Sequence, residues 1–62
     1  MFVLIATAVK KLQREAGISE DAATILIIAG LRGFPDNLVM NMDLLPGILN
    51  GIITVNTEFK LN

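Results

Sequence analysis

One segment of the chain, residues 22–31, is apolar on every side if it forms a helix. Only Thr24 and Gly30 interrupt its run of Ala, Ile and Leu, and a helix turns once in about 3.6 residues, so Ile25 to Ile28 point in all directions. A helix of this kind in a water-soluble protein must be covered on more than one side. The segment is about half as long as the roughly 20 residues that span a bilayer, so we do not expect it to cross a membrane.

The chain is too short to provide that cover easily. It has 62 residues, of which 53% are hydrophobic, and it has no Cys. A chain of this size buries only about 60% of the surface that it exposes when unfolded. Disulfides and thiolate metal sites often compensate for a small core, but neither is possible without Cys. We therefore predict a single small domain over residues 1–62 that completes its core by association.

Apolar residues recur at steps of three and four in the first segment, from Phe2 through Val9 and Leu12 to Ala16. This spacing predicts an amphipathic helix. Gly17 follows directly and is typical of a left-handed helix cap, so we expect the helix to end at Ala16. The apolar run of residues 1–6 is also compatible with a short buried strand, which would make the fold α+β.

Ser19 is placed to cap a second helix, and Glu20 and Asp21 suit the positive end of its dipole. A third helix over residues 36–45 is predicted from Leu38, Met42 and Leu45, which have helical spacing. Pro46 should end or kink that helix because proline lacks the backbone N–H.

The pattern changes towards the C-terminus, where Val55, Thr57, Phe59 and Leu61 alternate with polar residues. A period of two predicts a half-buried strand, which we place over residues 52–61. A short hairpin about Asn50-Gly51 is an alternative. The expected fold class is thus mainly α, with two to three helices and a C-terminal strand or short hairpin.

Catalytic residues are scarce in this composition. The chain has no His and no Cys, and its six carboxylates fall where helix caps and solvated faces explain them. We therefore expect no enzymatic activity, no cofactor, no metal ion and no small-molecule substrate.

The segment from Leu12 to Ser19, followed by Ala23 and Leu26, resembles the helix-turn-helix pattern of bacterial and phage repressors. In that family, a Gly in the turn and apolar residues beside it set the crossing of the two helices. Gly17 matches the turn, whereas Gln13 stands where the family has a small residue. The resemblance implies DNA contact by the second helix. Its candidate contact residues include no Lys or Arg to bind phosphates or base edges: they are Ser19, Glu20, Asp21, Thr24, Ile25 and Ile28.

The sequence predicts a cytoplasmic protein–protein interaction module, either a homo-oligomer, with a dimer favoured, or a regulator that docks on a larger protein. A degenerate helix-turn-helix DNA-binding protein and a membrane-active helical peptide are the alternatives. The net charge of −1 favours neither nucleic acid nor membrane as the partner. The predicted interface residues are large and apolar: Ile25, Leu26, Ile27, Ile28, Leu38, Met42, Leu45, Val55 and Phe59.

Overall fold

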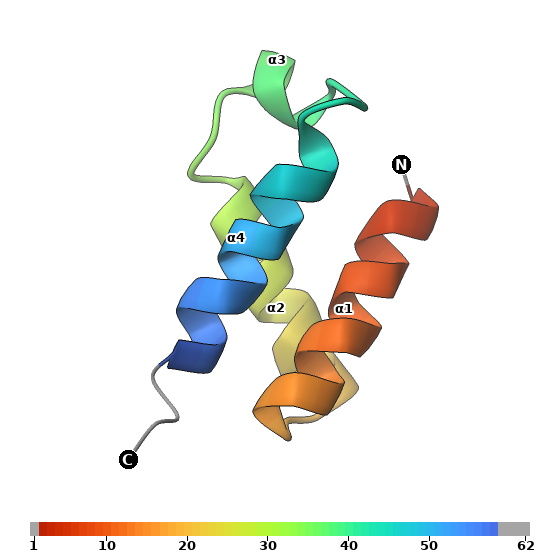
Figure 1. Ribbon diagram of the computed structural model, residues 1–62, viewed down its shortest axis with the longest axis vertical. Coiled ribbons are helices and arrows are strands. Elements are labelled where there is room, and N and C mark those ends of the chain that lie inside the picture. Colours follow the sequence, from red (N-terminus) through yellow and green to blue (C-terminus); the bar gives the residue numbers. More distant parts are fainter. Residues whose placement is uncertain (1, 59–62) are drawn as a thin grey trace.

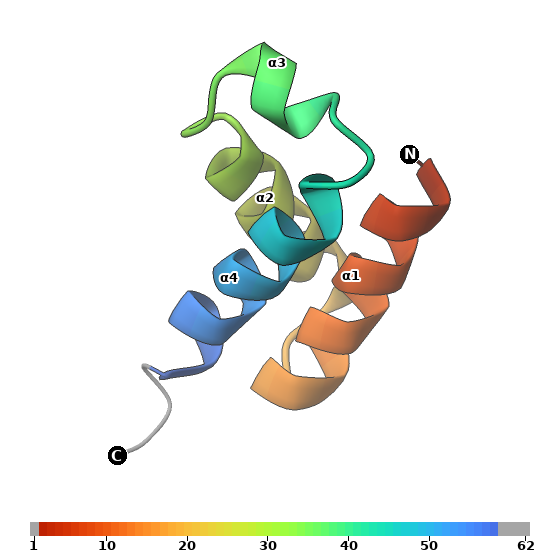
Figure 2. The same ribbon diagram turned by 45° about the horizontal axis from the view of Figure 1, so that its top comes forward.

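The computed structural model describes residues 2–58 of the chain, and over that range it is helical, without a strand. Its elements in chain order are α1 (Phe2–Ala16), α2 (Glu20–Leu31), α3 (Asp36–Val39) and α4 (Leu45–Glu58). The three long helices lie side by side as a bundle, and the short α3 lies across one end of it (Figures 1 and 2). The mainly helical, small fold is therefore confirmed.

The first helix follows its amphipathic pattern. Residues 2–6 belong to α1, so the alternative of an N-terminal strand is wrong. Val9, Leu12 and Ala16 of the predicted apolar face are buried together with Ala8, whereas Phe2 at the start of that face is 87% exposed. Gly17 has a φ of 67° and ends the helix in the left-handed conformation that only glycine adopts at low cost.

The predicted cap of the second helix is also present. The Ser19 hydroxyl oxygen accepts a hydrogen bond of 3.1 Å from the Ala22 backbone N–H. This bond satisfies one of the donors that the first turn of a helix leaves free. Glu20 and Asp21 lie in that first turn, where the helix dipole favours negative charge.

The C-terminal segment differs from the prediction. Residues 52–58 lie in α4 instead of a strand, and Asn50-Gly51 lies inside the same helix instead of in a hairpin turn. Residues 59–61 of the predicted strand lie outside the described residues.

Two local features are compatible with a helix over these residues. Pro46 does not end a helix but lies in the first turn of α4, where its missing N–H has no partner in any case. Polar side chains in the alternating region bond to the carbonyls of the turn before them: Thr54 Oγ1 donates to the Asn50 oxygen at 2.9 Å, and Asn56 Nδ2 donates to the Ile52 oxygen at 2.8 Å. These bonds satisfy the polar side chains within the helix itself, so the side chains need no partner elsewhere in the chain.

The predicted third helix over residues 36–45 is shorter in the structure. The helix α3 ends at Val39, and a turn over residues 40–44 leads into α4. Asn41 stabilises this turn, because its Oδ1 accepts a hydrogen bond of 2.9 Å from the Asp43 N–H. We call residues 32–44, which connect α2 to α4 and include α3, the strap.

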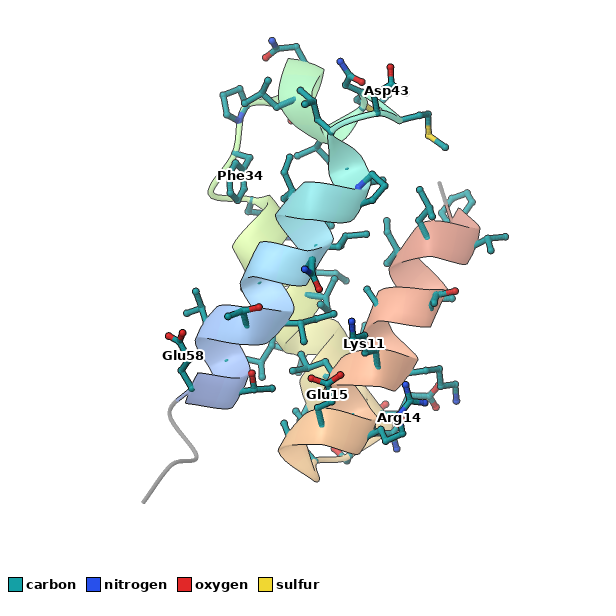
Figure 3. The ribbon with its side chains drawn as sticks, in the orientation of Figure 1. Lys11, Arg14, Glu15, Phe34, Asp43 and Glu58 are labelled. Atoms are coloured by element: carbon teal, nitrogen blue, oxygen red, sulfur yellow. The ribbon has the colours of Figure 1, made fainter. Side chains whose placement is uncertain are left out.

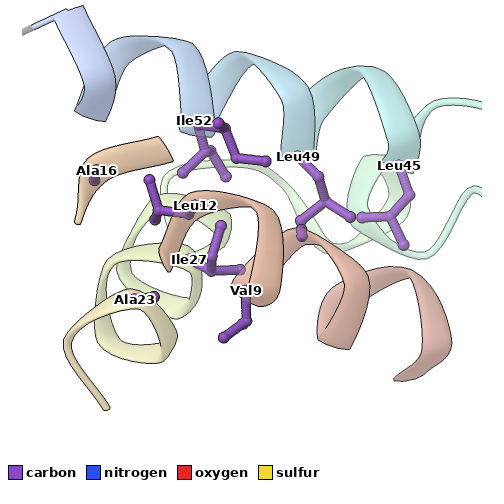
Figure 4. Packing of buried hydrophobic residues seen from close by; sticks show 10 residues of the cluster. Val9, Leu12, Ala16, Ala23, Ile27, Leu45, Leu49 and Ile52 are labelled. Carbon is purple, nitrogen blue, oxygen red and sulfur yellow. The ribbon is translucent and has the colours of Figure 1, made fainter. Parts of the chain in front are cut away.

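The core lies between the three long helices (Figure 4). Leu12, Ile27 and Leu45 are completely buried, one from each long helix. Helix α4 contributes most of the large side chains, because Leu45, Leu49, Ile52 and Ile53 share the face that packs on α1 and α2. The structure describes every residue of the strap, and none of them is buried.

Helix α2 approaches α4 closely because Gly30 has no side chain. A Cβ atom at Gly30 would lie 2.8 Å from both Cδ1 and Cγ1 of Ile52 and 2.9 Å from its Cγ2. These distances are too short for carbon atoms in contact, so any larger residue would push Ile52 or the two helices apart. By contrast, a Cβ at Gly51 would meet nothing within 4 Å.

We predict opposite effects for the same change at these two glycines. Gly30→Ala should destabilise the monomer by about 1 kcal/mol or more, since overpacking costs about 1–3 kcal/mol and the better helix propensity of Ala returns only part of it. Gly51→Ala should stabilise the monomer by up to about 1 kcal/mol. Urea denaturation of dilute protein would measure the free energy of unfolding of both variants. If both substitutions changed it by the same amount in the same direction, the close approach of α2 and α4 at Gly30 would be contradicted.

Candidate functional site: an apolar groove beside α4

A groove of about 700 Å³ lies between α4, the end of α2 and the strap. Its volume lies within the roughly 300–1,000 Å³ of most ligand pockets. Figure 3 shows Phe34 where α2 leads into the strap, beside α4. The lining residues are almost all apolar or glycine: Gly30, Phe34, Leu38, Leu44, Gly47, Ile48, Gly51, Ile52, Val55 and Asn56.

Gly47, Gly51 and Val55 form one face of α4 within this groove. They are four residues apart, so they lie above one another on the helix surface. A Cβ atom at Gly47 or Gly51 would meet nothing within 4 Å, so no part of the described chain requires glycine there. A glycine inside a helix costs about 1 kcal/mol relative to alanine. The two glycines thus make the helix of the monomer less stable, and no packing contact within the monomer compensates for this.

The groove has almost no polar character. Among the described residues, none with a charged side chain lines it. Of the described residues that line it, only Asn56 has a side chain with a hydrogen-bonding group, and its Nδ2 already donates to the Ile52 carbonyl at 2.8 Å. In Figure 3 the labelled charged side chains lie on α1, in the strap turn and on the last turn of α4, away from Phe34. An occupant of the groove would therefore be recognised by shape and apolar contact.

One wall of the groove belongs to the strap. Phe34, Leu38 and Leu44 reach it from there, whereas the opposite side consists of α4 and Gly30. Phe34 and Leu44 remain 38% and 45% exposed, so both are still available to a further apolar surface. The groove is thus bounded on one side by a rigid helix and on the other by residues that lie outside the core.

The structure separates the predicted interface residues into three groups. Leu38 and Val55 line the groove. Ile27 and Leu45 are fully buried in the core of their own chain, and Leu26 packs against that core. Ile25, Ile28 and Met42 are exposed but do not line the groove, and Phe59 lies outside the described residues.

Sequence reasoning did not identify Gly47 and Gly51 as parts of a site. Their spacing of four residues, continued by Val55, is visible in the sequence only once residues 45–58 are recognised as a helix. Interpreting Asn50-Gly51 as a turn placed the two glycines on different elements, which concealed the common face.

The segment that resembles a helix-turn-helix does form two helices joined by a tight turn. Leu12, Ala16 and Ala23, three of the apolar positions in the pattern, are buried. The outer face of α2 carries Glu20, and Lys10 Nζ of α1 lies 3.0 Å from its Oε2. Both side chains are well exposed, so this ion pair contributes little to stability. The acidic residues at the start of α2 would face a phosphate backbone unfavourably.

Two other kinds of site, a membrane span and a metal-binding cluster, are not found in residues 2–58. No described helix is long and apolar enough to cross a membrane. No group of three or more acidic side chains lies together in residues 2–58 in a way that could hold a metal ion. Comparison with known proteins finds no matching family model, curated protein or solved structure.

We predict that the groove binds a neutral apolar dye such as Nile red and that Gly51→Leu abolishes this binding. The leucine would occupy the groove without disturbing the monomer, because the space above Gly51 is open. We expect the dye affinity of Gly51→Leu to fall by at least about 10-fold, which corresponds to about 1.4 kcal/mol of binding free energy. This is less than the contribution of one buried leucine, so a leucine that takes the place of the dye can account for it. Fluorescence titration measures it.

Thr54→Leu is the matched control for this prediction. Thr54 is exposed on α4 but does not line the groove, so its leucine adds apolar surface without filling the hollow. Its dye affinity should equal that of the unchanged chain. If Gly51→Leu and Thr54→Leu bind the dye equally well, the dye binds elsewhere.

Proposed function

We propose that this chain is a small protein–protein interaction module that acts as a homodimer, with the groove beside α4 covered by a second copy. The observation that carries the proposal is the Gly47–Gly51–Val55 face, which is open, uncharged and unexplained by packing within the chain. Small residues at this spacing let the backbones of two helices approach closely.

A second copy fits the face because an uncharged, apolar groove does not repel itself. In a symmetric dimer each copy contributes the same patch, so two α4 helices would cross near Gly51 about a two-fold axis. The hollow over the glycines of one helix would receive Val55 or Leu44 of the other, two side chains that are 54% and 45% exposed in the monomer. The assembly closes on itself and leaves no further copy of the face uncovered.

The surface is large enough for such an interface. A stable dimer buries about 800 Å² on each partner, which is about a fifth of the 4298 Å² that this chain exposes. The groove supplies the centre of that area. Phe34 and Leu44, which line the groove from the strap and are 38% and 45% exposed, supply part of the surrounding area.

The composition of α2 agrees with association. Its own chain covers Ala23 and Ile27, but Ile25 remains 66% exposed and Ile28 remains 42% exposed. Full burial of a large aliphatic side chain contributes about 1.5–3 kcal/mol. These isoleucines lie outside the groove, so they would belong to the margin of a dimer or to a separate contact with a larger protein.

The test is sedimentation equilibrium over a wide range of protein concentrations. We expect the unchanged chain to approach twice its 6.7 kDa mass as concentration rises. Val55→Asp should keep it monomeric, because the charge would be desolvated at the centre of the interface. Urea denaturation of the same variant should show a monomer that remains folded, because Val55 lies outside the core.

Thr54→Asp is the matched control, since it introduces the same charge at the adjacent exposed position of α4. It should dimerise as the unchanged chain does. Ile27→Asp, which the apolar pattern of α2 also suggests, is unsuitable because Ile27 is fully buried and its loss would unfold the monomer. A chain that stays at 6.7 kDa at the highest soluble concentration would refute the proposal.

A further inference from the structure

We infer that the strap, residues 32–44, opens locally from the groove while the three long helices stay packed, and that it closes when a second copy occupies the groove. The inference rests on the proposed function for its second half only. It concerns the strap as a movable wall of the docking surface.

The strap has little apolar burial to hold it in place. Every long helix contributes buried side chains to the core, whereas no residue of the strap is buried. Its best-covered side chains are Leu38 and Val39, which are only partly buried. The free energy of local opening rises with the apolar surface that opening exposes, so the strap should open far more readily than the bundle.

The hydrogen bonds of the strap are local. Within α3, the Met40 N–H donates to the Asp36 carbonyl at 2.9 Å, and the Leu38 N–H donates to the Pro35 carbonyl at 3.0 Å. Other strap amides bond within the strap or to the adjoining turn of α2, and Leu45 N–H bonds to the Asn41 carbonyl at 2.9 Å where α4 begins. Among the described residues, no strap hydrogen bond reaches α1 or the middle of another helix. Opening of the strap would therefore break its own hydrogen bonds and those at the adjoining ends of α2 and α4, where the Ile48 N–H also donates to the Leu44 carbonyl at 3.1 Å, and would leave the middle of each long helix intact.

Val39 of the strap packs against the core, and three other apolar side chains of the strap line the groove. Phe34, Leu38 and Leu44 face the groove and remain partly in water in the monomer. A second copy lying over α4 would cover them and so add apolar burial to the closed strap alone. Binding that favours one of two states shifts the equilibrium towards it, so occupancy of the groove closes the strap.

Amide hydrogen exchange tests both the local opening of the strap and its closing on dimerisation. In dilute, monomeric protein, the amides of Leu38 to Asn41 should exchange about 10-fold or more faster than amides in the middle of α1, α2 and α4. As the concentration rises through the monomer–dimer transition, the strap amides should slow until they approach the core amides. Equal exchange rates of strap and core amides in the monomer would overturn local opening.

Leu38→Ser and Met40→Ser test whether the strap opens independently of the bundle. Leu38 lines the groove, whereas Met40 is an exposed strap residue that does not. Leu38→Ser should speed exchange of the strap amides and weaken dimerisation by about 10-fold, a change of about 1.4 kcal/mol, while core amides are unchanged. Met40→Ser should alter strap exchange little. A uniform acceleration of all amides by Leu38→Ser would contradict an independent strap.

The two proposals fail in different ways. If sedimentation shows only monomer, the proposed dimer and the closing of the strap are both wrong, while the exchange difference in that monomer still decides whether the strap opens locally. If the chain dimerises but the strap amides do not slow, the dimer stands and the coupling is wrong.

Discussion

The missing side chain at Gly30 brings α2 and α4 together, and the rest of the structure depends on that approach. Ile52 fills the space where a Cβ would lie, with three of its carbon atoms within 2.9 Å of that position. This contact joins the end of α2 to the middle of α4, so the apolar faces of both helices meet α1 around Leu12. Close packing of the three helices around these side chains excludes water from the centre of the bundle.

The glycines of α4 present the opposite situation. Gly47 and Gly51 lie in the same bundle, but nothing in the described chain occupies the space beside them. Ordinary folding would favour alanine at both positions, because alanine is the better helix former. The two glycines thus lower the stability of the helix, and no contact within the monomer offsets that loss. A contact in an assembly can offset it, and the apolar groove beside these glycines is where another helix would fit.

The division of the chain into a packed bundle and an unburied strap also follows from where the large aliphatic side chains lie. Leu45, Leu49, Ile52 and Ile53 are on one face of α4 and meet α1 and α2. The strap has Phe34, Leu38 and Leu44, but these face the groove and stay partly in water. The strap therefore borders an open apolar groove, which relates its proposed local opening directly to association.

Local signals in the sequence by themselves determined the first half of the fold. The spacing from Phe2 to Ala16, the glycine at 17 and the Ser19 cap each act through neighbouring residues, so α1, the turn and the start of α2 could be predicted. The helix over 45–58 could not, because Pro46 and the alternation around Val55 are locally compatible with a turn and a strand; only packing on α1 and α2 favours the helix. The tertiary structure also decided which residues of the apolar α2 are core and which are surface. Periodicity cannot distinguish Ile27 from Ile25 in a helix that is apolar all round, since only the position of neighbouring helices makes one side the inside.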